Sequence, residues 1–254
     1  AVTITGAQFE QNGSSQNGGG LYAQNTLTLS NTQFISNTIA GTGYSGGGAY
    51  ANGAATVLSS AFAGNRAGKG GGLYGSATLV VSNTHFISNT ATNTSADGGG
   101  GLYGYNTVEV IGGSFEGNRS SFHGGGMYAR LAVVVQGTQF ISNTAASTSS
   151  GGGGLYAYST LTLTDTDFIS NTALGTSGGA AGGGGVYVYS AAVISGGAFT
   201  GNRSSYTGGG LNARNTLTLT GTQFISNTAG ASAEGGGAYA TTPLIIGARF
   251  ERNW

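Results

Sequence analysis

The sequence contains no cysteine, one proline and very few charged residues. Without cysteine, neither a disulfide framework nor a cysteine metal site can form. Charged residues make up 6% of the chain, against roughly 25% in an average soluble domain. The eight basic and eight acidic residues balance, so the chain lacks the electrostatic footprint of a nucleic-acid-binding protein. No apolar run approaches the roughly 20 residues that cross a bilayer, so we expect no membrane span.

Glycine is abundant, at 52 of 254 residues, but it does not recur at every third position, which excludes a collagen helix. Two motifs alternate along the chain, and much of the glycine belongs to the second of them. Phe-x-x-Asn occurs ten times, beginning at Phe9, Phe34, Phe62, Phe86, Phe115, Phe140, Phe168, Phe199, Phe224 and Phe250. Gly-Gly-Gly, an apolar residue and a tyrosine occur together at Tyr22, Tyr50, Tyr74, Tyr103, Tyr128, Tyr156, Tyr187 and Tyr239, and Asn212 takes the place of tyrosine once.

The spacing of the two motifs separates a fixed frame from a variable loop. The step from a tyrosine position to the next phenylalanine has the same length in every repeat but the last, where Phe250 follows Tyr239 one position early. The return connection varies, from a short one between Phe62 and Tyr74 to a long one between Phe168 and Tyr187. A fixed frame with one variable connection per repeat is typical of a solenoid.

The frame has the pattern of β-strands. Leu27 and Leu29 alternate with Thr26, Thr28 and Ser30, and other repeats show the same period of two. Glycine, asparagine or aspartate usually stands three positions before the phenylalanine, where a sharp corner needs a left-handed backbone. We therefore predict an all-β, right-handed parallel β-helix of about ten coils, each of roughly 27 residues and three strands. Phenylalanine, leucine/valine and asparagine ladders should fill its interior.

We interpret residues 1–254 as a single β-helix domain or as a fragment of a longer β-helix. Phe9, Phe62, Phe115 and Phe168 follow one another at intervals of 53 residues, which indicates a duplicated unit of two coils. One coil of each pair carries a longer loop, so we expect the long loops to emerge on one side of the rod.

The combination of GGGLY and FISN resembles the GGA(I/V/L) and FxxN repeats of chlamydial polymorphic outer-membrane proteins, which belong to the pectate-lyase-like superfamily of β-helices. This resemblance covers essentially the whole chain, although the chain differs from that family in having no cysteine. It implies a surface-displayed β-helix, often an adhesin.

The tyrosines form the first candidate surface. If the residues on either side of each tyrosine point inward, the tyrosine points outward. We expect either a self-stacking ladder or a face that binds a glycan or a partner protein. The candidates are Tyr22, Tyr50, Tyr74, Tyr103, Tyr128, Tyr156, Tyr187 and Tyr239, with Tyr105, Tyr158 and Tyr189 two positions further on.

Outward isoleucines form the second candidate surface. We expect either that the long loop of its own coil covers each isoleucine, or that the isoleucines together form a lateral packing surface. The residues are Ile35, Ile87, Ile141, Ile169 and Ile225.

Residues that could carry catalysis are sparse. Asp165 and Asp167 form the only close acidic pair in the sequence, and two carboxylates fall short of the six to eight oxygens that calcium prefers. His85 and His123 have no partner at a recognisable spacing. We predict no catalytic residue, no metal site and no cofactor.

Our functional prediction is a non-enzymatic structural component of a bacterial surface, extracellular or attached to the cell, in a filament, sheath or adhesin rod. The alternative is an adhesin passenger that binds a host receptor or glycan through its tyrosines or long loops. A polysaccharide-active enzyme is the disfavoured rival. We expect axial head-to-tail self-association through Val2, Ile4, Phe250 and Trp254, because uncovered terminal coils expose strand edges.

Overall fold

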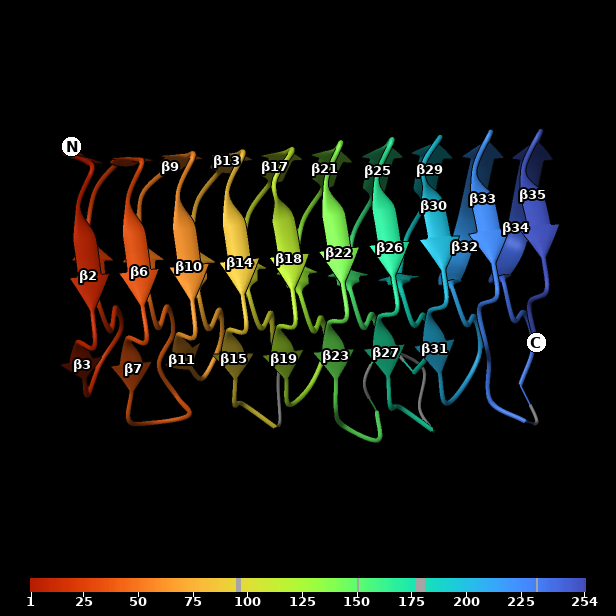
Figure 1. Ribbon diagram of the computed structural model, residues 1–254, viewed down its shortest axis with the longest axis horizontal. Helices are drawn as coiled ribbons and strands as arrows, with labels where there is room; N and C mark the ends of the chain where they lie inside the picture. Colours follow the sequence, from red (N-terminus) through yellow and green to blue (C-terminus); the bar gives the residue numbers. More distant parts are fainter. Residues whose placement is uncertain (95–96, 150, 177–180, 232) are drawn as a thin grey trace.

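The computed structural model describes residues 1–254 except 95–96, 150, 177–180 and 232. The chain winds into a parallel β-solenoid in which every strand pairs with the equivalent strand of the next coil (Figure 1). In Figure 1 the chain descends on the near side, rises on the far side and advances toward the C-terminus, which is a right-handed coil. The described residues contain no helix, so the all-β prediction is confirmed.

Three parallel sheets run along the axis, as predicted. The first sheet has ten strands, each centred on the phenylalanine of a Phe-x-x-Asn motif. These strands are β2 (Gln8–Glu10), β6 (Gln33–Ile35), β10 (Ala61–Ala63), β14 (His85–Ile87), β18 (Ser114–Glu116), β22 (Gln139–Ile141), β26 (Asp167–Ile169), β30 (Ala198–Thr200), β33 (Gln223–Ile225) and β35 (Arg249–Glu251).

The second sheet consists of eight two-residue strands that follow the motif asparagines. They are β3 (Gly13–Ser14), β7 (Thr38–Ile39), β11 (Arg66–Ala67), β15 (Thr90–Ala91), β19 (Arg119–Ser120), β23 (Thr144–Ala145), β27 (Thr172–Ala173) and β31 (Arg203–Ser204).

The third sheet has 17 strands and combines the tyrosine segments with the leucine/valine segments. The tyrosine strands are β4 (Leu21–Ala23), β8 (Ala49–Ala51), β12 (Leu73–Gly75), β16 (Leu102–Gly104), β20 (Met127–Ala129), β24 (Leu155–Ala157) and β28 (Val186–Val188). The leucine/valine strands are β1 (Val2–Thr5), β5 (Leu27–Ser30), β9 (Ala55–Leu58), β13 (Leu79–Ser82), β17 (Val108–Ile111), β21 (Val133–Gln136), β25 (Leu161–Thr164) and β29 (Ala192–Ser195). The strands β32 (Leu211–Thr220) and β34 (Ala238–Ile246) each span both segments.

The predicted phenylalanine ladder occupies the interior. Its ten rings stack with centroids 4.6–5.0 Å apart and nearly parallel planes. The eight rings from Phe34 to Phe224 are fully buried, and leucine, valine and alanine side chains of the third sheet pack against them.

An asparagine ladder runs beside the rings. At its centre, Oδ1 of Asn143 accepts hydrogen bonds from the backbone N–H and the Nδ2 of Asn118, at 3.0 and 2.9 Å. The Nδ2 of Asn143 donates to the carbonyl of Phe115 and to Oδ1 of Asn171, at 2.8 and 2.9 Å. The same pattern recurs from Asn37 to Asn227, so these buried amides satisfy one another along the axis.

The corners adopt the left-handed backbone that the sequence predicts. Asn31, Asn83 and Asp165 have φ of 48°, 46° and 45°. Glycine takes the equivalent position in most other coils, for example Gly137 with φ of 58°. Because residues of these types tolerate this region at small steric cost, the frame can turn at the same point in every coil.

The triple-glycine segments allow backbones of neighbouring coils to approach closely. A Cβ on Gly125 would overlap the carbonyl oxygen of Gly153 and lie 2.5 Å from backbone atoms of Thr144. Only glycine fits at this point without moving the next coil.

Candidate functional site

The tyrosine column comprises Tyr22, Tyr50, Tyr74, Tyr103, Tyr128, Tyr156, Tyr187 and Tyr239, with Asn212 between the last two. From Tyr22 to Tyr187 the rings stack with centroids 4.7–5.2 Å apart. The column lies on the opposite side of its strands from the phenylalanine core. The interpretation as a self-stacking ladder is therefore confirmed for these seven tyrosines.

The prediction that the whole column faces solvent is wrong. Tyr103, Tyr128, Tyr156 and Tyr187 are at most 3% exposed and form a second hydrophobic cluster. Tyr50, Tyr74 and Tyr239 are half-buried, and Tyr22 alone in the column is exposed, at 47%. Their side chains do point away from the phenylalanine core, but loop residues contact the rings: Asp97 bonds to Tyr103, and His123 stacks on Tyr156.

The covering loops contribute a small polar cluster over the middle of the column. The carboxylate of Asp97 accepts a 2.9 Å hydrogen bond from the hydroxyl of Tyr103. The same carboxylate lies 3.9 Å from Nζ of Lys69, whose ammonium is 5.4 Å from the Tyr103 ring centroid. Burial, reinforced by the charge of Asp97, raises the pKa of Tyr103 well above its usual value. This phenol therefore donates a hydrogen bond and stays protonated.

His123 belongs to the same cover. Its ring stacks on Tyr156 at 4.3 Å, and its Nδ1 accepts a hydrogen bond from the backbone N–H of Gly151 at 3.2 Å. Burial lowers the pKa of His123 to about 4, so the imidazole is neutral near pH 7. His123 thus packs as part of a loop.

Tyr105, Tyr158 and Tyr189 remain at the surface, as predicted, with exposed fractions of 43–49%. Tyr158 and Tyr189 stack on each other at 5.1 Å. The guanidinium of Arg130 lies 4.7 Å from the centroid of Tyr105. These three side chains, together with Tyr22, are exposed aromatic groups of this side of the rod.

The isoleucines lie in one row on the outer face of the phenylalanine sheet. Ile87 is 38% exposed, and Ile35, Ile141, Ile169 and Ile225 are half-buried. Ala63, Glu116 and Thr200 occupy the same row in the intervening coils. The expectation that each isoleucine is covered by its own loop is wrong for Ile87, and the row is not continuously apolar.

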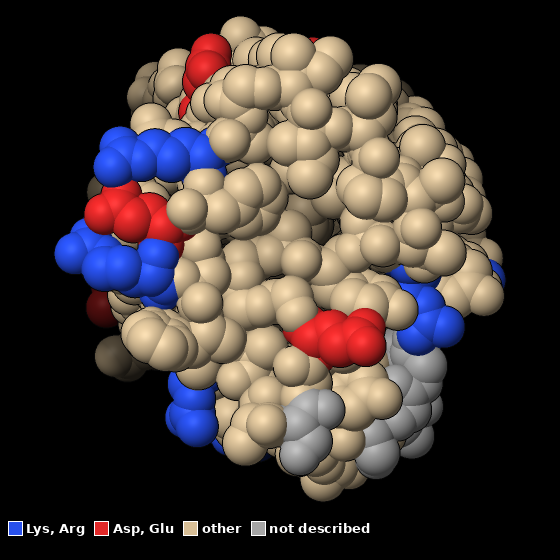
Figure 2. Space-filling model, turned by 90° about the vertical axis from the view of Figure 1, so that its right-hand side faces the viewer, with Lys and Arg blue, Asp and Glu red and all other residues tan. Residues whose placement is uncertain are grey.

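The residues proposed as assembly contacts lie in the first and last coils. Val2 is 37% exposed and Ile4 is half-buried. Phe250 stacks on Phe224 at 4.8 Å but is 45% exposed, and Trp254 is 81% exposed. The end of the rod seen in Figure 2 is mostly uncharged near its centre, and basic and acidic side chains gather at its left margin.

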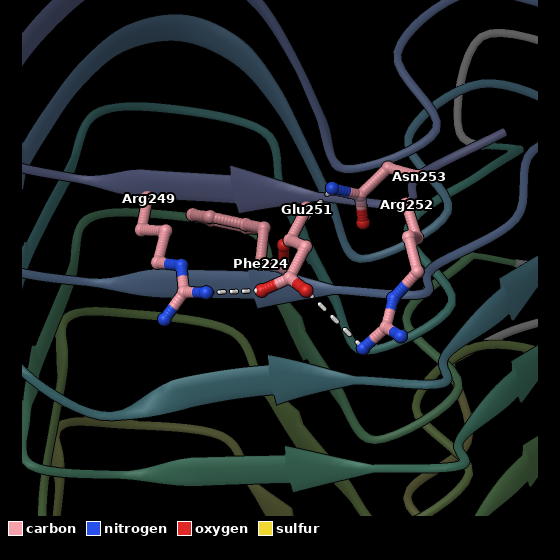
Figure 3. A network of polar contacts seen from close by, with 5 residues as sticks. All are labelled: Phe224, Arg249, Glu251, Arg252 and Asn253. Carbon is pink, nitrogen blue, oxygen red and sulfur yellow. Dashed lines mark hydrogen bonds and ion pairs between the residues drawn. The ribbon is translucent and has the colours of Figure 1, made fainter.

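The outer side of β35 carries a charged group that the sequence did not lead us to expect (Figure 3). The carboxylate of Glu251 pairs with the guanidinium groups of Arg249 and Arg252. Nδ2 of Asn253 donates a 2.9 Å hydrogen bond to the carbonyl of Phe224, which continues the asparagine ladder beneath this group.

The acidic pair has a structural role. Asp165 occupies a left-handed corner, and Oδ1 of Asp167 accepts a 3.0 Å hydrogen bond from the backbone N–H of Ala198 in the next coil. Within the described residues, no three His, Asp or Glu side chains are grouped as metal ligands. In the same part of the chain, no helix is long and apolar enough to cross a membrane.

Family models, curated proteins and solved structures yield no match to this chain. We therefore argue the candidate site from the residues of this chain alone.

The replacement of tyrosine by Asn212 is visible in the sequence, but the sequence assigns it no role. In the structure Asn212 is in register with Tyr187 on one side and Tyr239 on the other. A hollow of about 420 Å³ lies beside this smaller side chain. We call it the Asn212 hollow, and its lining residues are Tyr206, Thr207, Asn212, Arg214, Ala233, Glu234, Tyr239 and Thr241.

Proposed function

We propose that this chain is a non-enzymatic structural rod of a bacterial surface, displayed outside the cell. The observation that carries the proposal is the asparagine ladder, in which side-chain amides, buried from Asn37 to Asn227, link each coil to the next from Asn12 to Asn253. Together with three parallel sheets along the same axis, this ladder makes the rod a continuously hydrogen-bonded unit.

Further support comes from composition and from the repeat motifs. The sequence is rich in glycine and poor in charge, and it lacks cysteine. The GGGLY and FISN strings resemble repeats of bacterial surface β-helices. An elongated, modular solenoid suits a protein that spans a distance and displays loops along its length.

The first experiment tests modularity. Deleting residues 62–114 removes one two-coil unit and joins equivalent positions, because Phe62 and Phe115 occupy the same place in their coils. The shortened chain should fold, and small-angle scattering should find a rod about 10 Å shorter, since two coils are removed.

The matched control is the deletion of residues 61–114, which shortens the fixed frame by one further position. Because a shift of one position turns inward side chains outward, this variant should have a much lower melting temperature than the first. Equal stability of the two deletions, or failure of both to fold, would refute the modular description.

A further experiment tests location and role. Antibodies against the folded chain should label intact cells that produce it, and external protease should remove the label. Labelling only after cell lysis would refute the surface proposal.

A third experiment tests for enzymatic activity. The purified chain should fail to cleave pectin, alginate and related glycans. Turnover abolished by Asp165→Ala or Asp167→Ala would overturn the non-enzymatic proposal in favour of a polysaccharide-active enzyme.

A further inference from the structure

The Asn212 hollow differs from the rest of the tyrosine column in three independent respects. First, it is the place where the stack of rings stops. Tyr187 lies on one side with a ring that is completely buried, and the next ring in register is Tyr239, two coils away. A tyrosine at position 212 would continue the ladder, so the asparagine gives up the stacking that such a ring would contribute.

Second, the amide of Asn212 is buried and incompletely satisfied. Its side chain is 1% exposed, and its Nδ2 donates to Oγ1 of Thr207 at 2.6 Å and to the carbonyl of Ala181 at 3.3 Å. Among the described residues, Oδ1 of Asn212 is the only buried side-chain N or O atom without a hydrogen-bond partner. An unpaired buried acceptor destabilises the folded chain and calls for an explanation. This unpaired acceptor belongs to a residue that lines the hollow, so the asparagine is costly here both in lost stacking and in an unmade hydrogen bond.

Third, the strand that carries Asn212 is irregular at this point. The pairing of β32 with β34 shifts register between Ala213 and Thr216, so that Arg214 and Asn215 together oppose Thr241. This bulge absorbs the shorter frame of the last coil. Bulges of this kind re-aim side chains and are common beside functional sites. Arg214 takes the place that Tyr189 holds in the preceding coil.

The lining defines the chemistry of an occupant. Glu234 supplies a carboxylate, Arg214 a guanidinium, and Thr207 and Thr241 supply hydroxyls. Because one acid and one base line the same space, neither an anion nor a cation is favoured by charge alone. Tyr206 and Tyr239 add aromatic surface, and Tyr206 is 39% exposed. A volume of about 420 Å³ lies within the range of small-molecule sites.

We propose that the Asn212 hollow binds a neutral saccharide. A sugar ring presents vicinal hydroxyls that both donate and accept hydrogen bonds, and it also has an apolar C–H face that packs on tyrosine. One hydroxyl would donate to the carboxylate of Glu234, while the guanidinium of Arg214 donates to another. The rod role and this site are separate: the chain can be a structural rod whether or not the hollow binds a sugar.

The test is ligand-observed NMR with the purified full chain. The probes are methyl glycosides of glucose, galactose, mannose and N-acetylglucosamine, with glucuronate and glucosamine as the charged counterparts. At least one neutral glycoside should receive saturation from the protein and should be preferred over both charged sugars. No binding by any neutral glycoside, or a preference for a charged sugar, would overturn the proposal.

Two variants tie binding to the hollow. Asn212→Tyr restores the ladder residue of the other coils and fills the space, so binding should be lost while the melting temperature holds or rises. The matched control, Tyr22→Asn, makes the reverse exchange at the exposed start of the column and should bind as the wild type does. If Asn212→Tyr does not fold, Glu234→Gln decides: it should weaken binding by at least about tenfold. Unaltered binding in a folded Asn212→Tyr, or in Glu234→Gln, would refute the site.

Discussion

Removing one amide from the middle of the asparagine ladder tests the source of the rod's stability. Asn143→Ala deletes four hydrogen bonds: two that Oδ1 accepts from Asn118, and those that Nδ2 donates to Phe115 and Asn171. The backbone N–H of Asn118 then has no acceptor at a fully buried position.

The magnitude follows from these four bonds. At about 0.5–1.5 kcal/mol each they give about 2–6 kcal/mol, and the orphaned N–H places the result in the upper half of that range. We expect the free energy of unfolding to fall by about 4–6 kcal/mol. The matched control is Asn12→Ala, at an exposed rung whose side chain makes a single hydrogen bond, to Asn37, and we expect a loss below about 1 kcal/mol there.

Denaturant unfolding measures the loss in the free energy of unfolding, and amide hydrogen exchange shows where along the rod stability is lost. Both are needed because long repeat arrays can lose two-state behaviour. Exchange of the Asn118 amide should accelerate strongly in Asn143→Ala, while the Asn202 amide, whose acceptor is Asn227, should keep its protection. If the Asn118 amide stays protected and the variant loses under about 1 kcal/mol, the ladder is not a main source of the rod's stability.

Packing and burial make three further perturbations informative. Phe140→Ala removes a fully buried, stacked ring and should cost about 3–5 kcal/mol in denaturant unfolding, whereas a loss below about 1 kcal/mol would contradict its place in the core. Gly125→Ala should lower the melting temperature far more than Gly43→Ala, because its Cβ would overlap the Gly153 carbonyl while nothing lies within 4 Å of a Cβ on Gly43; equal losses would refute the close-packing argument. The folded-state pKa of His123 is lowered to about 4 from 6.5, so the unfolded chain binds a proton that the folded chain does not as pH falls through this window. Stability should therefore drop by up to about 3 kcal/mol toward pH 4, and His123→Gln should remove that part of the slope; an unchanged slope in His123→Gln would show that another group is responsible.

The coil could be predicted from sequence because its determinants are local and periodic. Alternation of Leu27 and Leu29 with threonine sets the inward face, and a left-handed corner at Asn31 ends the strand at the same point in each coil. The constant step from tyrosine to phenylalanine then places every Phe and every motif Asn in register. Each of these signals lies within one repeat, so a single sequence contains it many times over.

The cover of the tyrosine column could not be predicted in the same way. Strand alternation correctly placed Tyr103 and Tyr156 on the side away from the phenylalanine core. It gave no information on Asp97 or His123, which reach these rings from loops of differing length and sequence. The burial of these tyrosines depends on contacts between non-equivalent parts of neighbouring repeats. The periodicity of the sequence does not reveal such contacts.

The bulge at Arg214 and Asn215 is a second such case. The early arrival of Phe250 after Tyr239 showed that the last frame is one position short, but not where the sheet would absorb the difference. The register shift lies in the pairing of β32 with β34, which both span the tyrosine and leucine/valine segments. The position of the bulge therefore depends on how the two strands pair, and neither repeat determines it alone.

The variable loops thus give the solenoid a second core. In the first and last coils of the column, Tyr22 and Tyr239 keep substantial exposure, whereas the four consecutive rings from Tyr103 to Tyr187 are sealed. The two longest connections precede Tyr187 and Tyr103, while Tyr128 follows a short connection yet is buried between covered neighbours. His123, in the connection before Tyr128, stacks on Tyr156, so a loop of one coil covers the tyrosine of the next. A rod built in this way can change its surface through its loops, or through a single ladder residue such as Asn212, without disturbing the Phe and Asn ladders that hold the coils together.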